Sequence, residues 1–291
     1  MSQTFSLVLT RRNQVGKSNV FRLMFSEQVT ISPGTTMTLA ESSIYNCFKN
    51  IHQYYGNNTF SINWLSTLSN FTIPNGGYSI DDLGSYIESV CFNANLYWLN
   101  GNTIVYPFSI KSNPTGYGAQ IICIPIPSAT EVSASNGAIK KPTGASWNFS
   151  TKQTAILTLC SPLAVMLGYT NSDGSVQVNF PPVAQQNIYT FDSPSAPDMK
   201  SVEGIIIKCN FLNNAMLDAN SCDTLAVISN NVSFGDLKEY RAPYKRDLSV
   251  YPRAYQYLEL VLYDNEYRAL DGRFLIDSDI TFSIDLTMPP K

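Results

Sequence analysis

One stretch near the end of the chain decides its fold class, Ile280-Thr281-Phe282-Ser283-Ile284-Asp285-Leu286-Thr287. Apolar and polar residues alternate strictly along it, so all of its large apolar side chains fall on one face of an extended strand. A half-buried strand of this kind is typical of two antiparallel sheets that pack face to face, with one face of each sheet on the core.

The same period of two recurs toward both ends of the chain. It predicts three strands before residue 50 and five after residue 200, and eight is the number of strands in a jelly roll. The predicted strands contain residues 5–9, 21–25, 37–45, 205–211, 224–229, 234–241, 257–263 and 280–286.

The middle of the chain, residues 51–200, changes character. Ser79 followed by Asp82 has the spacing of a capping box, and apolar residues then recur at helical steps over about three turns. Ser161, Pro162 and Gly168 predict the N-cap, first residue and stop of a second, short helix.

The rest of the middle segment is expected to hold strands and loops. Asn100-Gly101 predicts a hairpin that joins residues 97–99 to 104–110, and residues 121–126 form a further expected strand. Residues 128–146 are predicted to be an exposed loop, and 180–200 to lack regular structure. We therefore expect a mainly β fold, a single jelly-roll β-sandwich of residues 1–50 and 201–291 with an inserted mixed α+β lobe at 51–200.

Composition narrows the function classes. Charged residues make up 14% of the chain, against roughly 25% in an average soluble domain. The net charge of −3 argues against a dedicated nucleic-acid-binding protein, and no apolar run reaches the ~18 residues of a membrane helix. The basic residues at the N-terminus follow a short apolar run rather than precede it, so no signal peptide is expected. The six scattered cysteines are expected to be reduced.

Several local patterns also occur in a characteristic order. The patterns are Leu7-Val8-Leu9-Thr10, residues 21–25, Asn58-Thr59-Phe60-Ser61-Ile62, residues 73–83, Tyr106-Pro107-Phe108-Ser109-Ile110, residues 117–121, 163–169, 205–213, Phe234-Gly235, 257–264 and 280–286. In this order, over nearly the whole chain, the sequence resembles the penton (minor capsid) proteins of virophages and related polinton-like DNA viruses.

This resemblance implies a structural protein without catalytic or cofactor residues. It implies a homopentamer at each fivefold vertex of an icosahedral particle, where the major capsid protein and other minor capsid proteins are the neighbours. The protein would then be located in the virion, at the capsid vertices, after assembly inside the host cell.

Two groups of basic residues are candidate interfaces. The first contains Lys238, Arg241, Lys245, Arg246 and Arg253, with tyrosines between them. It fits a contact with an acidic neighbour in the shell, a contact with nucleic acid, or a solvated loop. The second contains Arg11 and Arg12, with Lys17 and Arg22 nearby, and fits a capsomer contact or a solvated turn.

Metal and catalytic sites have weaker support. Asp277, Asp279 and Asp285 lie near the last strand, and Asp277 and Asp279 could share a calcium ion with backbone carbonyls, although turn residues are the simpler interpretation. The single histidine, His52, is expected to be structural, since the sequence contains no G-x-S-x-G motif. Isolated acids such as Glu41, Glu88 and Glu203 form no recognisable pair for glycoside hydrolysis.

Three functions therefore stay open at the level of sequence. The first is the capsid vertex protein, which assembles through apolar and aromatic patches and is not an enzyme. The alternative is a jelly-roll carbohydrate-binding or host-attachment protein, because the same fold hosts lectins. The third is a hydrolase that uses a pair of carboxylates.

Overall fold

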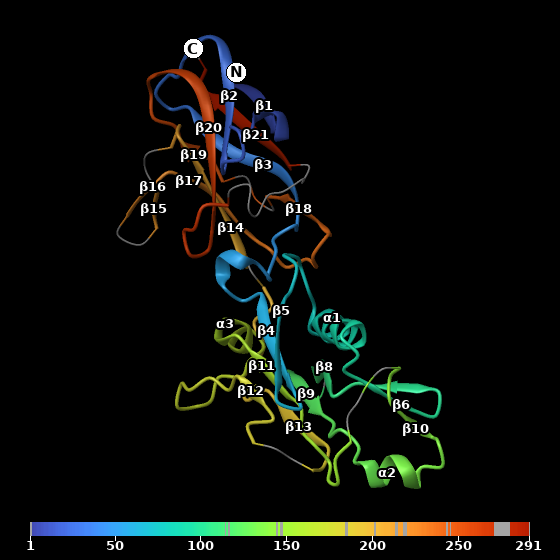
Figure 1. Cartoon of the computed structure of the whole chain (residues 1–291). Coiled ribbons are helices and arrows are strands. Elements are labelled where there is room, and N and C mark those ends of the chain that lie inside the picture. The colour runs from blue at the N-terminus through green and yellow to red at the C-terminus, as the bar shows by residue number, and fades with distance from the viewer. Residues whose placement is uncertain are drawn as a thin grey trace. The chain divides into compact units, whose positions relative to one another are not determined.

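The computed structural model shows a mainly β chain whose sheets consist of antiparallel strand pairs (Figure 1). It describes residues 2–113, 115, 117–143, 145, 148–183, 186–200, 202–212, 215–217, 220–242, 244, 246–270 and 280–290. The chain divides into two compact units, which are Met1–Phe48 with Ser201–Lys291 (unit 1) and Lys49–Lys200 (unit 2).

Unit 1 contains two larger sheets and one hairpin. The first sheet has the strand order β1-β21-β3-β18, with β19 also paired to β3, and the second has the order β17-β14-β20-β2. The strands are β1 (Gln3–Thr10), β2 (Val20–Thr30), β3 (Thr36–Tyr45), β14 (Gly204–Cys209), β15 (Ala215–Leu217), β16 (Asn220–Cys222), β17 (Thr224–Ser229), β18 (Leu237–Arg241), β19 (Leu248–Ser249), β20 (Ala254–Asp264) and β21 (Ile280–Met288).

The two sheets pack face to face, as the alternation of their sequences predicts. Phe282 of β21 is fully buried, and its ring meets that of Phe21 of β2 at 5.5 Å, edge to face. Met37 of β3 and Cys209 of β14 place their sulfur atoms 3.6 Å apart. Burial of these alternate side chains from both sheets supplies the hydrophobic core of unit 1.

Unit 2 combines three small sheets with three short helices. Its sheets have the orders β12-β11-β4-β5, β13-β9-β8 and β10-β6-β7. The elements are η2 (Gln53–Tyr55), β4 (Thr59–Trp64), β5 (Thr67–Thr72), α1 (Ile80–Asn93), β6 (Trp98–Asn100), β7 (Thr103–Val105), β8 (Phe108–Asn113), β9 (Gly118–Cys123), α2 (Ala129–Ala134), β10 (Ile139–Lys140), β11 (Ile156–Leu159), α3 (Ser161–Met166), β12 (Asn179–Phe180) and β13 (Tyr189–Asp192).

Helix α1 begins where its capping box predicts. The Asp82 backbone N–H donates to Ser79 Oγ at 3.1 Å, and the Ser79 N–H donates to Asp82 Oδ2 at 2.9 Å. The helix buries Leu83, Gly84 and Ile87 in the core of unit 2. The neighbouring Asp81 carboxylate accepts hydrogen bonds from β8, which fixes the start of the helix against that sheet.

Several boundaries differ from those expected from sequence. The expected loop 128–146 contains α2, where Ser128 and Glu131 form a capping box, and β10. The N-cap of α3 is Cys160 rather than Ser161, so the helix begins at Ser161, one residue earlier than expected.

Two further differences concern strands of unit 2. The segment 180–200 contains β13, because its residues complete the edge of β9. The strand expected over 104–110 is divided, since β7 pairs with β6 whereas β8 turns away to pair with β9.

Candidate interaction surfaces

The outer face of the β17-β14-β20-β2 sheet is apolar and aromatic. Strand register places Val227, Ile206 and Tyr263 in one row, and Met24 beside Tyr257 in another. Val227 is 55% exposed and Met24 is 62% exposed. A sheet that meets only water carries polar residues on this side, so the composition is that of a contact surface. We call this surface the outer apolar face; its exposed members are Met24 and Val227, its half-buried members are Val20, Tyr257, Val261 and Tyr263, and Ile206 lies buried between its neighbours.

The charges on the same face are already paired. Arg22 donates to Glu259 Oε2 from Nη2 at 2.6 Å and from Nε at 3.0 Å, and its guanidinium lies 4.6 Å from the Tyr257 ring centre. These hydrogen bonds to Glu259 are the main cause that raises the pKa of Arg22. Lys208 Nζ lies 3.2 Å from Asp223 Oδ1. Because both cations have a partner within the chain, covering this face would not leave either charge alone.

The outer face of the other sheet of unit 1 is rich in hydroxyl groups. Ser6 Oγ donates to Asp285 Oδ1 at 2.7 Å, and the hydroxyls of Thr4 and Thr287 lie 3.2 Å apart. These cross-strand pairs link β1 to β21 through short polar side chains. The two sheets of unit 1 therefore present chemically different outer faces.

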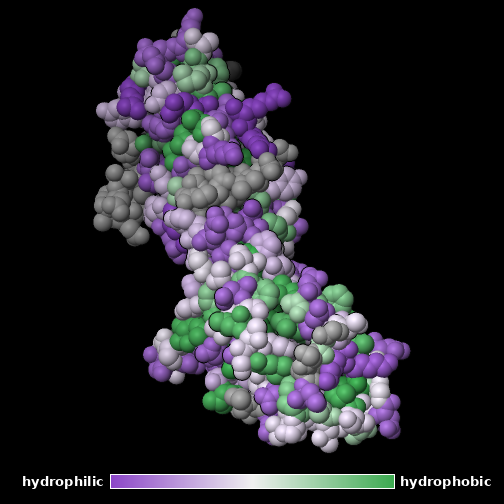
Figure 2. All heavy atoms as spheres, viewed as in Figure 1, coloured by the Kyte–Doolittle hydropathy of each residue, from purple (hydrophilic) through white to green (hydrophobic). Residues whose placement is uncertain are grey.

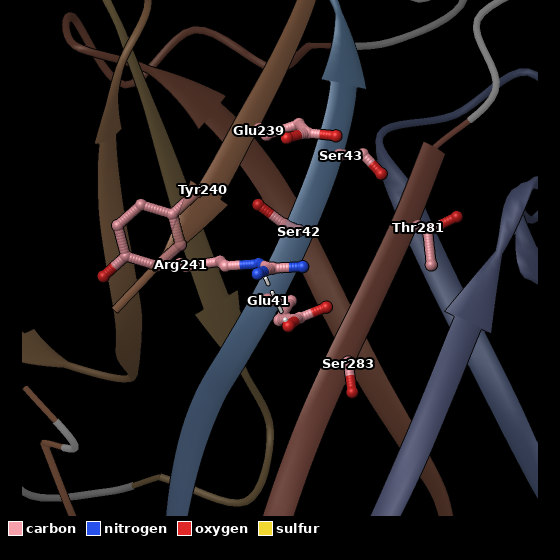
Figure 3. Close-up of a pocket in the computed structure, with 8 residues that line it drawn as sticks. All are labelled: Glu41, Ser42, Ser43, Glu239, Tyr240, Arg241, Thr281 and Ser283. Carbon is pink, nitrogen blue, oxygen red and sulfur yellow. Dashed lines mark ion pairs between the residues drawn. The ribbon is translucent and has the colours of Figure 1, made fainter. Parts of the chain in front are cut away.

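A small pocket of about 80 Å³ opens on the hydroxyl-rich face. Arg241 Nε lies 3.2 Å from Glu41 Oε1 across β18 and β3, with Ser43 also on β3 and Thr281 and Ser283 on β21 (Figure 3). The Arg241 side chain is 78% exposed, so the pair contributes little stability. The pocket is polar and has room for little more than a few water molecules.

The structure does not gather the predicted basic segment into one patch. Lys238 and Arg241 point to opposite faces of β18, and Lys238 donates to Asn231. Arg253 stacks on Tyr255, with 4.6 Å between the guanidinium carbon and the ring centre. Arg246 lines a second pocket of unit 1. Lys245 lies outside the described residues.

The second predicted basic group lies in a short 3-10 helix, Arg11–Asn13, that follows β1. Thr10 caps it, because its hydroxyl accepts from the Arg12 N–H at 3.3 Å while its own N–H donates to Asn13 Oδ1 at 2.9 Å. Arg11 and Arg12 are both exposed. The geometry fits either a contact with a neighbour or a solvated turn.

The metal and catalytic candidates acquire no site in the part of the chain that the structure describes. No group of three metal-ligating side chains occurs among these residues, and Asp277 and Asp279 lie outside them. The Asp285 carboxylate accepts a hydrogen bond from the Ser6 hydroxyl, and Glu41 forms an ion pair with Arg241.

The other sequence candidates are dispersed. Glu88 belongs to unit 2 and Glu203 to unit 1. His52 is the N-cap of η2, where its Nδ1 accepts from the Tyr54 N–H at 3.0 Å, and this contact gives it a structural role.

Sequence reasoning missed the outer apolar face, although its signal is present in β20. Tyr257, Val261 and Tyr263 alternate there with leucines, so the strand is apolar on both faces. Only the strand register shows that β2, β14 and β17 place more apolar residues beside them. Unit 2 instead shows separate hydrophobic areas between polar ones on the face seen in Figure 2.

Among the described residues, no helix combines the length and the hydropathy that crossing a bilayer requires. No family model and no curated protein sequence matches the chain. Among solved structures, the chain is similar to the crystal structure of the selenomethionine-labelled mavirus penton protein, with a TM-score of 0.47 and 9% sequence identity. The alignment covers 99% of this chain and 99% of that chain.

Proposed function

We propose that the protein is a capsid vertex (penton) protein, which forms homopentamers at the fivefold vertices of an icosahedral DNA virus particle and contacts the surrounding major capsid protein. It acts by assembly and not by catalysis. The outer apolar face carries this proposal, because an aromatic sheet face with its charges already paired is suited to being covered by a neighbour.

The strand order of unit 1 supports a jelly roll. When the short β15, β16 and β19 are left aside, the first strand pairs with the last of eight, the second with the seventh, the third with the sixth and the fourth with the fifth. This is the order of a long hairpin rolled into two sheets, which is the jelly-roll arrangement. In the sequence, unit 2 follows the third of these strands and precedes the fourth, as expected for an inserted lobe.

Closed rings of identical subunits fit a chain whose surfaces differ from one side to the other. A heterologous interface joins two different patches of the same chain and closes when the rotation allows it. The outer apolar face and the hydroxyl-rich face provide two such patches in unit 1. The proposed number of subunits in the ring, five, rests on the sequence resemblance to virophage pentons.

The solution mass of the purified chain tests the proposal. Light scattering should give five times 32.3 kDa, and negative-stain images of the same peak should show five-pointed rings. A stable dimer or trimer would contradict the proposal. A monomer would require the same measurement after co-expression with the major capsid protein.

The alternative, a carbohydrate-binding or attachment protein, has one observation in its favour. In unit 2, the rings of Phe92 and Tyr97 stack at 5.2 Å with an angle of 18°, and Phe92 is 45% exposed. A flat aromatic pair with an exposed Phe92 and a half-buried Tyr97 could support the apolar face of a sugar ring. Specific binding on a glycan array that is lost on Phe92→Ala would favour this function.

A further inference from the structure

A second pocket in unit 1, of about 180 Å³, has a different character from the polar one. It is lined by β3, β17, the end of β18 and Arg246. Leu39, Leu225 and Ala242 give it an apolar wall, whereas Thr224 and Arg246 bring polar groups. A pocket with an apolar wall and a few convergent polar groups is the usual form of a binding site.

Thr224 lines the pocket and has an unpaired hydroxyl. The residue is 7% exposed, and its hydroxyl oxygen is buried without a hydrogen bond to any described group. Buried hydroxyls in folded proteins are almost always paired, and leaving one unpaired is unfavourable.

Among the described residues that line the pocket, Arg246 is the only charged one. Its side chain is exposed, whereas the next residue, Asp247, is engaged through a hydrogen bond from Thr38 Oγ1 to its Oδ1 at 2.8 Å. Since none of the described residues that line the pocket is a carboxylate, the guanidinium favours an anionic group there, and a carboxylate matches its geometry.

The adjacent strand edge is open. β17 pairs with β14 on one side, and on its other side no described strand pairs with it. In an antiparallel sheet, every second residue of such an edge strand turns its N–H and C=O groups outward. Extended peptides bind such edges by strand addition, with side-chain pockets giving specificity.

We propose that this pocket binds the carboxyl-terminal residue of an extended segment of another protein, which adds to the free edge of β17. The aliphatic side chain of that residue packs on Leu39 and Leu225, and its carboxylate pairs with Arg246. A terminal aliphatic residue carries both groups on one Cα. An Asp or Glu side chain would instead bring its charge without filling the apolar wall.

The pocket shares Val227 with the outer apolar face, and its test uses a defined probe that reports peptide binding rather than assembly. The probe is an N-terminally fluorescein-labelled hexapeptide, TSTVTV, with a free carboxylate, and its binding to the full chain is followed by fluorescence polarisation. Two matched peptides serve as comparisons, one with a terminal carboxamide and one with N-methyl groups on alternate amides. The carboxylate peptide should bind at least about tenfold more tightly than either comparison.

Two variants test the residues. Arg246→Gln should reduce the affinity for the carboxylate peptide to that of the carboxamide, and Ala242→Phe should weaken both by filling the pocket. Arg12→Gln, an exposed arginine that does not line the pocket, should leave affinity within about twofold. Circular dichroism confirms that each variant is folded.

Three outcomes would overturn the proposal. They are no saturable binding of the carboxylate peptide, equal affinity for the carboxylate and carboxamide, and full binding of the N-methylated peptide, which cannot add as a strand.

Discussion

Gly84 of α1 is the residue that allows the helix to lie directly against β8. A Cβ at this position would lie 1.9 Å from the Ile110 carbonyl oxygen, and this neighbour is backbone rather than a flexible side chain. Glycine is unfavourable inside a helix by roughly 0.5–1 kcal/mol relative to alanine, so its presence here reflects the close approach.

Gly84→Ala should therefore destabilise the protein despite the better helix propensity of alanine. We expect a loss of about 2 kcal/mol or more, because the helix must move away from the sheet. The urea midpoint of unfolding, followed by circular dichroism, measures the loss. Ser89→Ala, at an exposed position of the same helix, is the control and should change stability by less than about 0.5 kcal/mol. An unchanged midpoint for Gly84→Ala would show that the close approach is absent.

Residue-scale features were the least accessible to sequence reasoning. The β4–β5 hairpin turns through Leu65 and Ser66, which both have positive φ. Such turns are normally recognised by Asn-Gly or Asp-Gly, and this pair gives no such signal. Leu65 adopts a positive φ while its side chain packs against the core of unit 2. This contact involves residues distant in the sequence, so a local sequence pattern does not predict it.

At the scale of the element, the cap of α1 links helix stability to pH. The pKa of Asp82 is lowered, first by the hydrogen bond from the Ser79 hydroxyl and then by that from the Ser79 N–H. A carboxylate with a lowered folded-state pKa stabilises the protein above its unfolded pKa, and this contribution is lost as the pH falls through the folded pKa.

Asp82→Asn tests this linkage. Near neutral pH, the variant should unfold more easily than the parent chain by up to about 1 kcal/mol, the usual size of a capping interaction. The difference should stay constant from a pH of about 6 to about 5 and shrink as the pH falls below about 4 toward about 2, since the parent carboxylate then becomes protonated. Urea unfolding at each pH gives the two curves. A constant difference over the whole of this range would mean that the charge of Asp82 does not act through the cap.

Element prediction succeeded where the signal was local and long. The capping box and apolar period of α1 specify the helix within the sequence itself. The same capping box at Ser128 and Glu131 begins only a six-residue helix with no buried residue, so apolar periodicity did not reveal it. β13 was missed because it exists as the edge partner of β9, which lies far away in the sequence.

At the scale of the whole molecule, alternation predicted two packed sheets but not their contacts. The candidate basic residues were adjacent in sequence, yet β18 sends Lys238 and Arg241 to opposite faces. The outer apolar face requires the registers of four strands from both ends of the chain. Such surfaces depend on the pairing of strands that are distant in the sequence. The partners and register of these strands cannot be predicted from a single sequence.

If the outer apolar face is covered on assembly, a charge within it should prevent assembly. Met24→Glu places a carboxylate at a 62% exposed position of this face, where it would be desolvated in the assembled state. The pentamer should dissociate, with the thermal midpoint of the monomer little changed. Leu68→Glu in unit 2, at 61% exposure, is the matched control and should leave the mass unaltered. Assembly by the Met24 variant would exclude this face as the interface.

The division of unit 1 across the chain can be tested with fragments. Residues 1–200 and 201–291, when co-expressed, should associate, because β1 and β3 of the first fragment pair with β21 of the second. Co-purification through a tag on one fragment measures this association. Residues 201–291 expressed alone should lack cooperative unfolding, since two strands of the first sheet and one strand of the second are missing. Recovery of two independent folded fragments would contradict the observed pairing.

The pairing of β1 with β21 also orders events during synthesis on the ribosome. β21 lies between β1 and β3 in its sheet, so β1 has no neighbour until the last segment of the chain has emerged. Unit 2, by contrast, is fully translated while 91 residues of unit 1 are still to come. We therefore expect the nascent chain to expose an unpaired β1 and β3 for most of translation. Those strands are the part of the newborn protein most in need of a chaperone.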